Sequence, residues 1–194
     1  MDRLLDCEWI LEDAEFIVEA DREDMTAADL ANFGGSILKP ADISLISKHR
    51  IAWKKVKGIS LIFEDDVILS PNFSDTLSKY VAELPPDWDL LFIGNGCDLH
   101  IQADHINPYK YTYPKCLEPT SWGGDGATRC TDSYVISERC AALFAADPDR
   151  PIQKPIDFYM NDLCRKYKCK VFWAEPTIVT QGSETGLFEV SARK

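Results

Sequence analysis

The sequence has no apolar run long enough to cross a bilayer, which takes about 20 consecutive residues in a helix. Residues 1–6 read MDRLLD and lack the basic and apolar regions of a signal, so we expect no secretory leader. Internal repeats and low-complexity tracts are absent too. With 194 residues and 45% hydrophobic content, the chain suits one compact domain. We therefore expect a single-domain, cytoplasmic protein without a membrane span.

CxxC pairs are absent, although the chain has seven cysteines, at positions 7, 97, 116, 130, 140, 164 and 169. An odd number of cysteines leaves at least one unpaired in any disulfide framework. We predict reduced and mostly buried thiols.

Basic residues are scarce, with 21 Lys and Arg against 32 Asp and Glu, for a formal charge of −11. Binding to nucleic acid without sequence preference needs a stripe of Lys and Arg to neutralise phosphates, and this composition disfavours it. A bound metal cation could still bring a phosphate into this negative field. We expect no nucleic-acid partner.

The most informative feature present is a group of three acids, Glu64, Asp65 and Asp66, which follows an apolar run at residues 59–63. In open α/β sheets, ligands bind beyond the carboxyl ends of such strands. Strand side chains alternate, so Glu64 and Asp66 fall on one side. Mg²⁺ and Mn²⁺ are typically held by one or two carboxylates together with substrate phosphates. The motif predicts a metal held by Glu64 and Asp66, and the alternative is an acidic loop facing water.

The remaining pattern predicts an α/β fold. The strand–helix–strand order over residues 59–93 indicates a parallel pair joined by a right-handed crossover. Residues 97–131 have no sustained period and suggest a functional or mobile loop. Expected strands cover residues 15–19, 59–62, 89–93, 133–136 and 170–173, and expected helices cover 4–11, 42–56, 70–83, 138–146 and a segment from 155.

Further candidates are spread along the chain. Asp157 lies in the first turn of a predicted helix, either as a general base or only as an acid that the helix dipole favours. His49 could bond the nucleotide or phosphate, or be a histidine on a helix surface. The glycine-flanked turn with Gln181, Gly182 and Ser183 could approach a diphosphate or metal, or be a surface loop.

Six segments, in this order, make the chain resemble glycosyltransferase family 25, which includes bacterial lipooligosaccharide galactosyltransferases and procollagen galactosyltransferases. Each segment is weak alone, but the ordered set covers roughly three quarters of the chain. The segments are SKH at 47–49 with AW at 52–53, SLIFEDD at 60–66, DWDLLFIG at 87–94, SYVIS at 133–137, PID at 155–157 and AEP at 174–176.

The resemblance implies a GT-A-like (Rossmann-like) fold with a mostly parallel central sheet flanked by helices. It also implies transfer of a sugar from a UDP-sugar donor to a glycan or glycoprotein acceptor, with inversion at the anomeric carbon. Mn²⁺ or Mg²⁺ would be held through the acidic motif, here Glu64 and Asp66. Inversion needs a base opposite the leaving diphosphate, for which Asp157 is the first candidate and Asp162 the second.

Two departures from the family pattern stand out. Family members begin with a strand and an Asn-Leu-Asp-Arg-like turn, whereas here Met1 is followed directly by the predicted helix at residues 4–11. The chain is then either a domain without the usual first strand or part of a longer polypeptide. The Ser-His of the family is Lys48-His49 here. A nucleotide-sugar binding module without catalysis and a metal-dependent phosphoesterase remain alternatives to glycosyl transfer.

Overall fold

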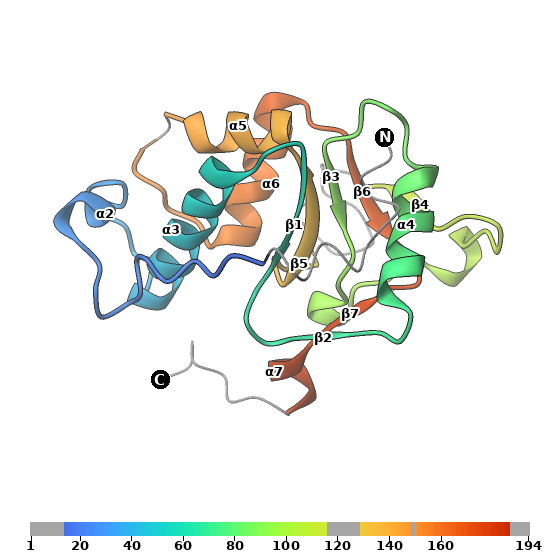
Figure 1. Ribbon diagram of the computed structural model, residues 1–194. Helices are drawn as coiled ribbons and strands as arrows, with labels where there is room; N and C mark the ends of the chain where they lie inside the picture. Colours follow the sequence, from blue (N-terminus) through green and yellow to red (C-terminus); the bar gives the residue numbers. More distant parts are fainter. Residues whose placement is uncertain (1–13, 116–128, 149, 187–194) are drawn as a thin grey trace.

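The computed structural model describes residues 14–115, 129–148 and 150–186 of the chain (Figure 1). The helix expected at residues 4–11 lies outside these ranges. The described elements are α2 (Ala27–Ala31), α3 (Pro40–Lys55), β1 (Ile59–Phe63), β2 (Val67–Leu69), α4 (Phe73–Glu83), β3 (Leu90–Phe92), η1 (Gly96–Asp98), η2 (Ala103–His105), β4 (Thr112–Pro114), β5 (Ser133–Ser137), α5 (Glu138–Ala146), α6 (Ile156–Tyr167), β6 (Val171–Ala174), β7 (Val179–Gln181) and α7 (Gly182–Thr185).

The central sheet has the strand order β1-β5-β3-β6-β4, and β2 pairs with β7 in a separate two-stranded sheet. The α/β class is confirmed, but the expected mostly parallel sheet is wrong for the described strands. Only β3 and β6 pair in parallel, while the other three neighbouring pairs are antiparallel. β5 lies between β1 and β3 and is antiparallel to both. The strands of the predicted crossover therefore run in the same direction without being hydrogen-bonded neighbours.

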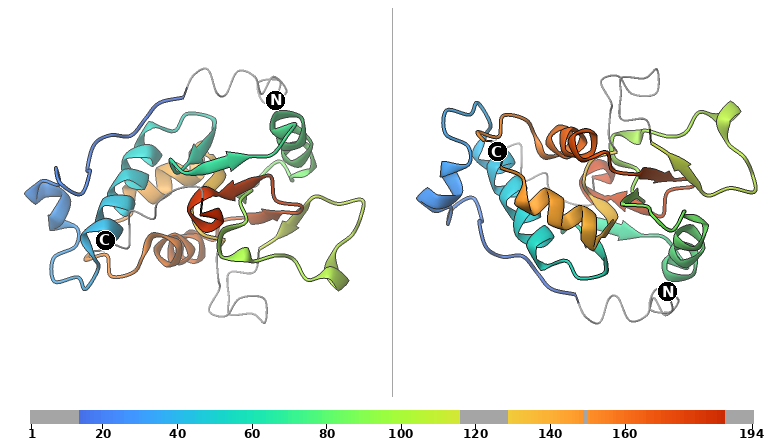
Figure 2. Two further views of the ribbon diagram at one scale, coloured as in Figure 1. Left: turned by 90° about the horizontal axis from the view of Figure 1, so that it is seen from below. Right: turned by 90° about the horizontal axis from the view of Figure 1, so that it is seen from above.

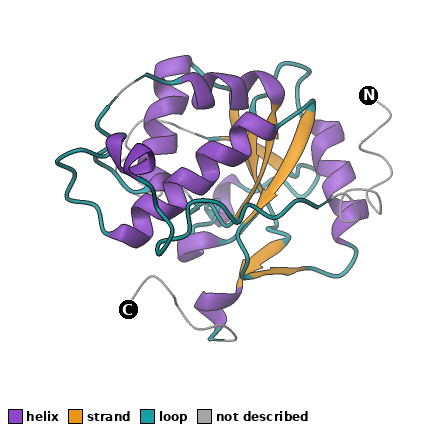
Figure 3. Cartoon of the chain, turned by 60° about the vertical axis from the view of Figure 1, so that its left-hand side comes forward, coloured by secondary structure: helices purple, strands orange, loops and turns teal. Residues whose placement is uncertain are grey.

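Helices cover both faces of the central sheet. Leu90 and Phe92 of β3 pack in a core cluster with residues of α3, α5 and α6. Leu91 and Ile93 point to the opposite face, where they pack with residues of α4. This alternation is the period of two expected of a strand with both faces buried. The views from below, from above and from the side show the strands between α4 and the other three helices (Figures 2 and 3).

Most predicted elements form where the sequence placed them, and the helix ends show why. Ser137 caps α5, because its Oγ accepts the N–H of Cys140 at 3.2 Å. The helix expected from residue 70 begins instead at Phe73, with Asn72 at the N-cap in the left-handed conformation. Among the described helices, none is both long and apolar enough to cross a membrane.

The strand expected at residues 15–19 does not form. Phe16 is 81% exposed and Val18 is 67% exposed, and this segment is irregular. No strand of the described sheets pairs with it, and an unpaired strand cannot satisfy its backbone groups. The alternating apolar residues predicted a strand, but no described strand lies beside this segment to pair with it.

β1, β3 and β6 all end at the same edge of the sheet, and β5 begins there. The small sheet lies at this edge as well, since Gly94, just beyond β3, forms a parallel bridge with Val179 of β7 (Figure 1). The residues that follow β1 and precede β5 are thereby brought together. This is the edge where the acidic motif was expected to act.

Candidate functional site

The three acids of the motif form the turn between β1 and β2. Asp65 is exposed, whereas Glu64 and Asp66 are half-buried, which agrees with the predicted alternation. The two inward carboxylates, of Glu64 and Asp66, have different neighbours.

Glu64 is fixed by the segment that leads into β5. Its backbone N–H donates to the carbonyl of Asp132 at 2.8 Å, and the Thr131 hydroxyl donates to its Oε1, also at 2.8 Å. The Nε2 of His49 lies 3.6 Å from the same oxygen, too far for a direct hydrogen bond. Among the described residues, a backbone carbonyl and a hydroxyl therefore position Glu64, and no Lys or Arg forms an ion pair with it.

His49 lies on α3 and is only 4% exposed, so the alternative of a surface histidine is wrong. Trp53 Nε1 donates to the Tyr134 hydroxyl at 2.9 Å, and that hydroxyl lies 2.8 Å from His49 Nδ1. The buried hydroxyl has one proton, and Nδ1 is the acceptor in reach, so Nδ1 is unprotonated. A ring that accepts this proton on Nδ1 carries its own proton on Nε2, which faces Glu64.

Asp157 stands in the first turn of α6, as predicted, and is half-buried. Burial raises the pKa of its carboxyl group, and the charge of Glu64 raises it further. Its own backbone N–H opposes this rise, as would a positive charge on His49. Asp157 therefore lies within electrostatic range of both Glu64 and His49. A carboxylate with a raised pKa is a better proton acceptor than an exposed one.

Asp66 contacts the start of α7. Its Oδ2 accepts the N–H of Ser183 at 3.1 Å, and its carbonyl accepts the N–H of Gly182 at 2.7 Å. The N–H of Gln181 donates to the Oδ1 of Asn95 at 3.3 Å. These three N–H groups of the glycine-flanked turn already have acceptors in the protein, so their predicted contact with a diphosphate would require them to exchange partners.

The other oxygen of Asp66 is the clearest sign of a ligand. Asp66 Oδ1 is buried and has no hydrogen-bond partner within the described ranges. A buried carboxylate oxygen without a donor costs folding free energy, and a cation would satisfy it. No group of three or more His, Cys, Asp or Glu side chains in the described part of the chain is arranged to hold a metal. The buried, unpartnered Oδ1 of Asp66 is the feature that would suit a cation completed by substrate phosphates.

Asp162, the second candidate base, has different surroundings. It forms ion pairs with Lys154 and Arg165 on the outer side of α6. Partial burial raises the pKa of Asp162, but the hydrogen bonds and charges of its two partners outweigh burial, so its pKa lies below the ordinary value. A carboxylate held in this way is a poor proton acceptor.

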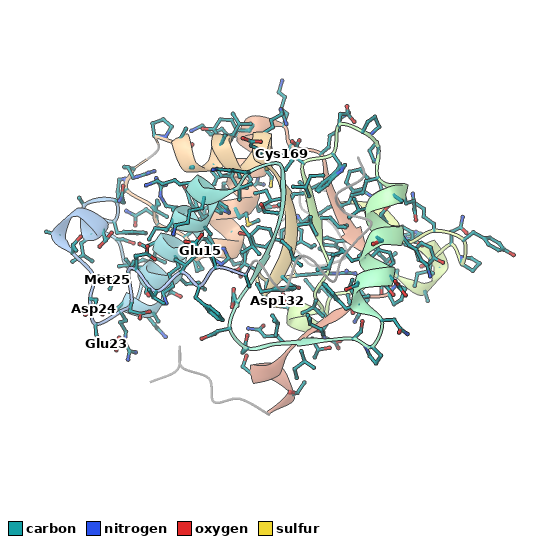
Figure 4. The ribbon with its side chains drawn as sticks, in the orientation of Figure 1. Glu15, Glu23, Asp24, Met25, Asp132 and Cys169 are labelled. Atoms are coloured by element: carbon teal, nitrogen blue, oxygen red, sulfur yellow. The ribbon has the colours of Figure 1, made fainter. Side chains whose placement is uncertain are left out.

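Sequence reasoning missed the two residues before β5. Thr131 and Asp132 are both 1% exposed. The Ser133 hydroxyl donates to Asp132 Oδ2 at 2.9 Å, and a Cβ placed on Gly94 would lie 1.9 Å from that oxygen. Gly94 therefore lets the carboxylate lie against the end of β3, at the sheet edge near β2 and β7 (Figure 4). A polar pair directly before a buried strand was the available signal.

A buried ion pair between Arg129 and Glu175 holds the segment that leads into β5. Arg129 is fully buried and bonds Glu175 Oε2 and the carbonyl of Ala174, both at 2.5 Å. Its guanidinium also lies over the ring of Trp173, 4.5 Å from the centroid. Burial lowers the pKa of Arg129, and the charge of Glu175 counters this effect. The chain just before Thr131 is thus tied to the residues that follow β6.

No protein-family model matches this sequence, and no curated protein matches it. The resemblance to glycosyltransferase family 25 accordingly stays a prediction from the motifs.

Proposed function

We propose that this chain is a metal-dependent glycosyltransferase that moves a sugar from a UDP-sugar to a hydroxyl of a glycan or glycoprotein, with inversion. The proposal includes the cytoplasmic location and a GT-A-like arrangement in which β1, β3 and β6 are the strands that share one direction. It combines the ordered motifs with the chemistry of the sheet edge.

One observation carries the proposal. Two inward-facing acids elsewhere in the described part of the chain have basic partners: Asp89 pairs with Arg139 and Glu175 with Arg129. Glu64, Asp66 and Asp157 form no ion pair with Lys or Arg among the described residues; their neighbours are a hydroxyl, a neutral histidine and backbone N–H groups. Partly buried carboxylates that lack cationic partners favour a cation from outside.

The residues divide into two roles. Glu64 and Asp66 would hold Mn²⁺ or Mg²⁺, which when bound supplies Lewis-acid stabilisation of the departing UDP. Asp157 would accept the proton of the acceptor hydroxyl as that oxygen bonds to the anomeric carbon and the bond from this carbon to UDP breaks. His49, with its proton on Nε2, can donate a hydrogen bond to an oxygen placed between its ring and Glu64.

A donor screen tests the proposal. Purified protein is incubated with a panel of UDP-sugars and Mn²⁺, and UDP release is measured with and without excess chelator. We expect release from one donor that depends on the metal. Asp66→Asn should lower the rate at least tenfold, since it removes a charge from the metal site, whereas Asp75→Asn, an exposed acid on α4, should leave it unchanged.

Each outcome discriminates between the candidate functions. Equal turnover in chelator would contradict the metal-dependent reaction. Heat on mixing UDP and Mn²⁺ with the protein, without product across donors and acceptors, would favour a binding module. Hydrolysis of generic phosphate esters would favour the phosphoesterase.

A further inference from the structure

Two cysteines meet beside the acidic site. Cys97 Sγ and Cys130 Sγ lie 3.0 Å apart, whereas bonded sulfurs lie about 2.05 Å apart. No disulfide joins any two of the cysteines in the described ranges. The two thiols come from residues 33 positions apart in the sequence, so this contact is built by the fold. A movement of about 1 Å would complete a bond between them.

The backbone holds the two thiols together. Cys97 and Cys130 both have positive φ angles, of 59° and 61°, which L residues seldom adopt. Gly96, just before Cys97, has no room for a side chain, because a Cβ there would lie 2.1 Å from the carbonyl oxygen of Arg129. The segment after β3 and the segment before β5 are therefore packed backbone against backbone at this point. Such a contact keeps the sulfurs in place through ordinary side-chain motion.

The two thiols also differ in a way that suits sequential reaction. Cys97 is exposed, and Cys130 is half-buried. Burial raises the pKa of Cys130, and the neighbouring Cys97 thiol raises it further. A dissolved reagent therefore reacts first with the exposed Cys97, and the less accessible Cys130 acts as the resolving thiol.

We propose that Cys97 and Cys130 are a reversible disulfide site that reacts with low-molecular-weight disulfides of the glutathione type. The Cys97 thiolate attacks one sulfur of the reagent, breaks its S–S bond and releases one thiol. Cys130 then gives its proton to solvent, attacks Cys97 Sγ and releases the second thiol. The reagent gains two electrons and two protons, and the protein pair loses them.

This site bears directly on the acidic edge. Cys130 precedes Thr131, whose hydroxyl holds Glu64, and the charges of Asp157 and Asp132 act on the Cys130 thiol. Closing the bond ties this segment to the loop after β3. The disulfide site itself does not depend on the proposed glycosyl transfer, because it rests on the position of the two sulfurs alone.

The other described sulfurs provide an internal comparison. Cys140 and Cys169 Sγ are 3.7 Å apart, but both side chains are buried, and Cys169 lies at the opposite end of the sheet from Asp132 (Figure 4). A dissolved disulfide cannot reach them in the folded protein. Proximity combined with access distinguishes the pair at 97 and 130.

The test uses the whole reduced protein, treated with graded ratios of oxidised to reduced glutathione and then digested without reductant. We expect a species two hydrogens lighter than the reduced protein, with the peptides of Cys97 and Cys130 joined and the peptides of Cys140 and Cys169 still reduced. The thermal midpoint should rise when the bond forms and return on adding dithiothreitol, since a crosslink that fits the native fold constrains the unfolded chain.

Two variants make the test decisive. Cys130→Ser should stop the reaction at a stable glutathione adduct on Cys97, and Cys97→Ser should leave residue 130 unmodified. Circular dichroism checks that both are folded. A wild-type protein that accumulates the Cys97 adduct without the crosslink, or a crosslink that lowers the thermal midpoint, would overturn the proposal.

Discussion

Replacing Tyr134 with phenylalanine tests the hydrogen-bonded group that positions His49. The Tyr134 side chain is fully buried, and its hydroxyl connects Trp53 Nε1 with His49 Nδ1. Tyr134→Phe keeps the ring, which stacks on His49 at a centroid distance of 5.7 Å, and removes only the shared oxygen and its proton. Two buried polar groups then lose their partner at once.

The magnitude follows from those two groups. A buried donor or acceptor left without a partner costs about 1–3 kcal/mol. Because both Trp53 Nε1 and His49 Nδ1 lose their partner, we expect the free energy of unfolding to fall by about 3 kcal/mol. For a domain of this size, about 1 kcal/mol lowers the thermal midpoint by about 2–4 °C, so the expected fall is about 6–12 °C. A change of tautomer cannot rescue His49, because a proton on Nδ1 would face the phenyl ring.

A graded series provides the controls. The Tyr80 hydroxyl donates a single bond to the carbonyl of Pro176 at 2.7 Å, and Tyr80→Phe should cost about 1 kcal/mol. Tyr109 is 92% exposed, and Tyr109→Phe should stay within about 0.5 kcal/mol of wild type. Urea unfolding followed by circular dichroism measures all three.

A spectroscopic readout separates the positioning of His49 from stability alone. In ¹⁵N spectra of the imidazole, wild type should show the proton on Nε2, and Tyr134→Phe should populate both tautomers. The reasoning fails if Tyr134→Phe costs no more than Tyr109→Phe, or if wild type carries the proton on Nδ1.

Two further substitutions probe the same edge. Because burial and Glu64 raise the pKa of Asp157, the folded state favours the protonated acid, and the stability that this gives is lost as the pH rises through the folded pKa. Asp157→Asn should therefore raise the urea midpoint at neutral pH and lose that gain below the ordinary pKa of 3.8. The same substitution should abolish transfer. An equal midpoint at neutral pH would contradict the raised pKa. Gly94→Ala should cost about 1–3 kcal/mol in thermal unfolding, because its Cβ would meet Asp132 Oδ2 at 1.9 Å, whereas Gly34→Ala, with nothing within 4 Å, should be neutral or stabilising by less than about 1 kcal/mol.

Local patterns in the sequence predicted the helices and strands better than they predicted which strands pair with one another. The run before Glu64, the Ser137 cap and the helix after Pro155 each depend on neighbours in sequence, and each formed as expected. The place of β5 between β1 and β3 depends on contacts between residues about 40 to 80 positions apart, which no local pattern encodes. The shared direction of β1 and β3 was therefore predictable, whereas the strand order and the antiparallel pairing of β5 were not.

The candidate site shows the same division. Glu64, Asp66 and Asp157 were found because acids stand out beside apolar runs or at a helix start. Thr131 and Asp132 were missed because their importance comes from the reversed direction of β5, which brings the start of that strand to the end of β1. The pairing of Cys97 with Cys130 was equally hidden, since it depends on the close approach of Gly96 to Arg129.

The groups around Glu64 suit the cation site that we propose, because they order the carboxylate without placing a lysine or arginine beside it. A lysine or arginine at the place of Thr131 or His49 would hold the carboxylate in position, but it would also neutralise the charge that a metal needs. The Thr131 hydroxyl fixes the carboxylate through a hydrogen bond, and the His49 ring lies beside it without a direct one. Burial is the main cause of the raised pKa of Asp157, and the nearby Glu64 raises it further. Under the proposed function, a positioned carboxylate without a basic partner would bind a cation, and that binding would stabilise the folded chain.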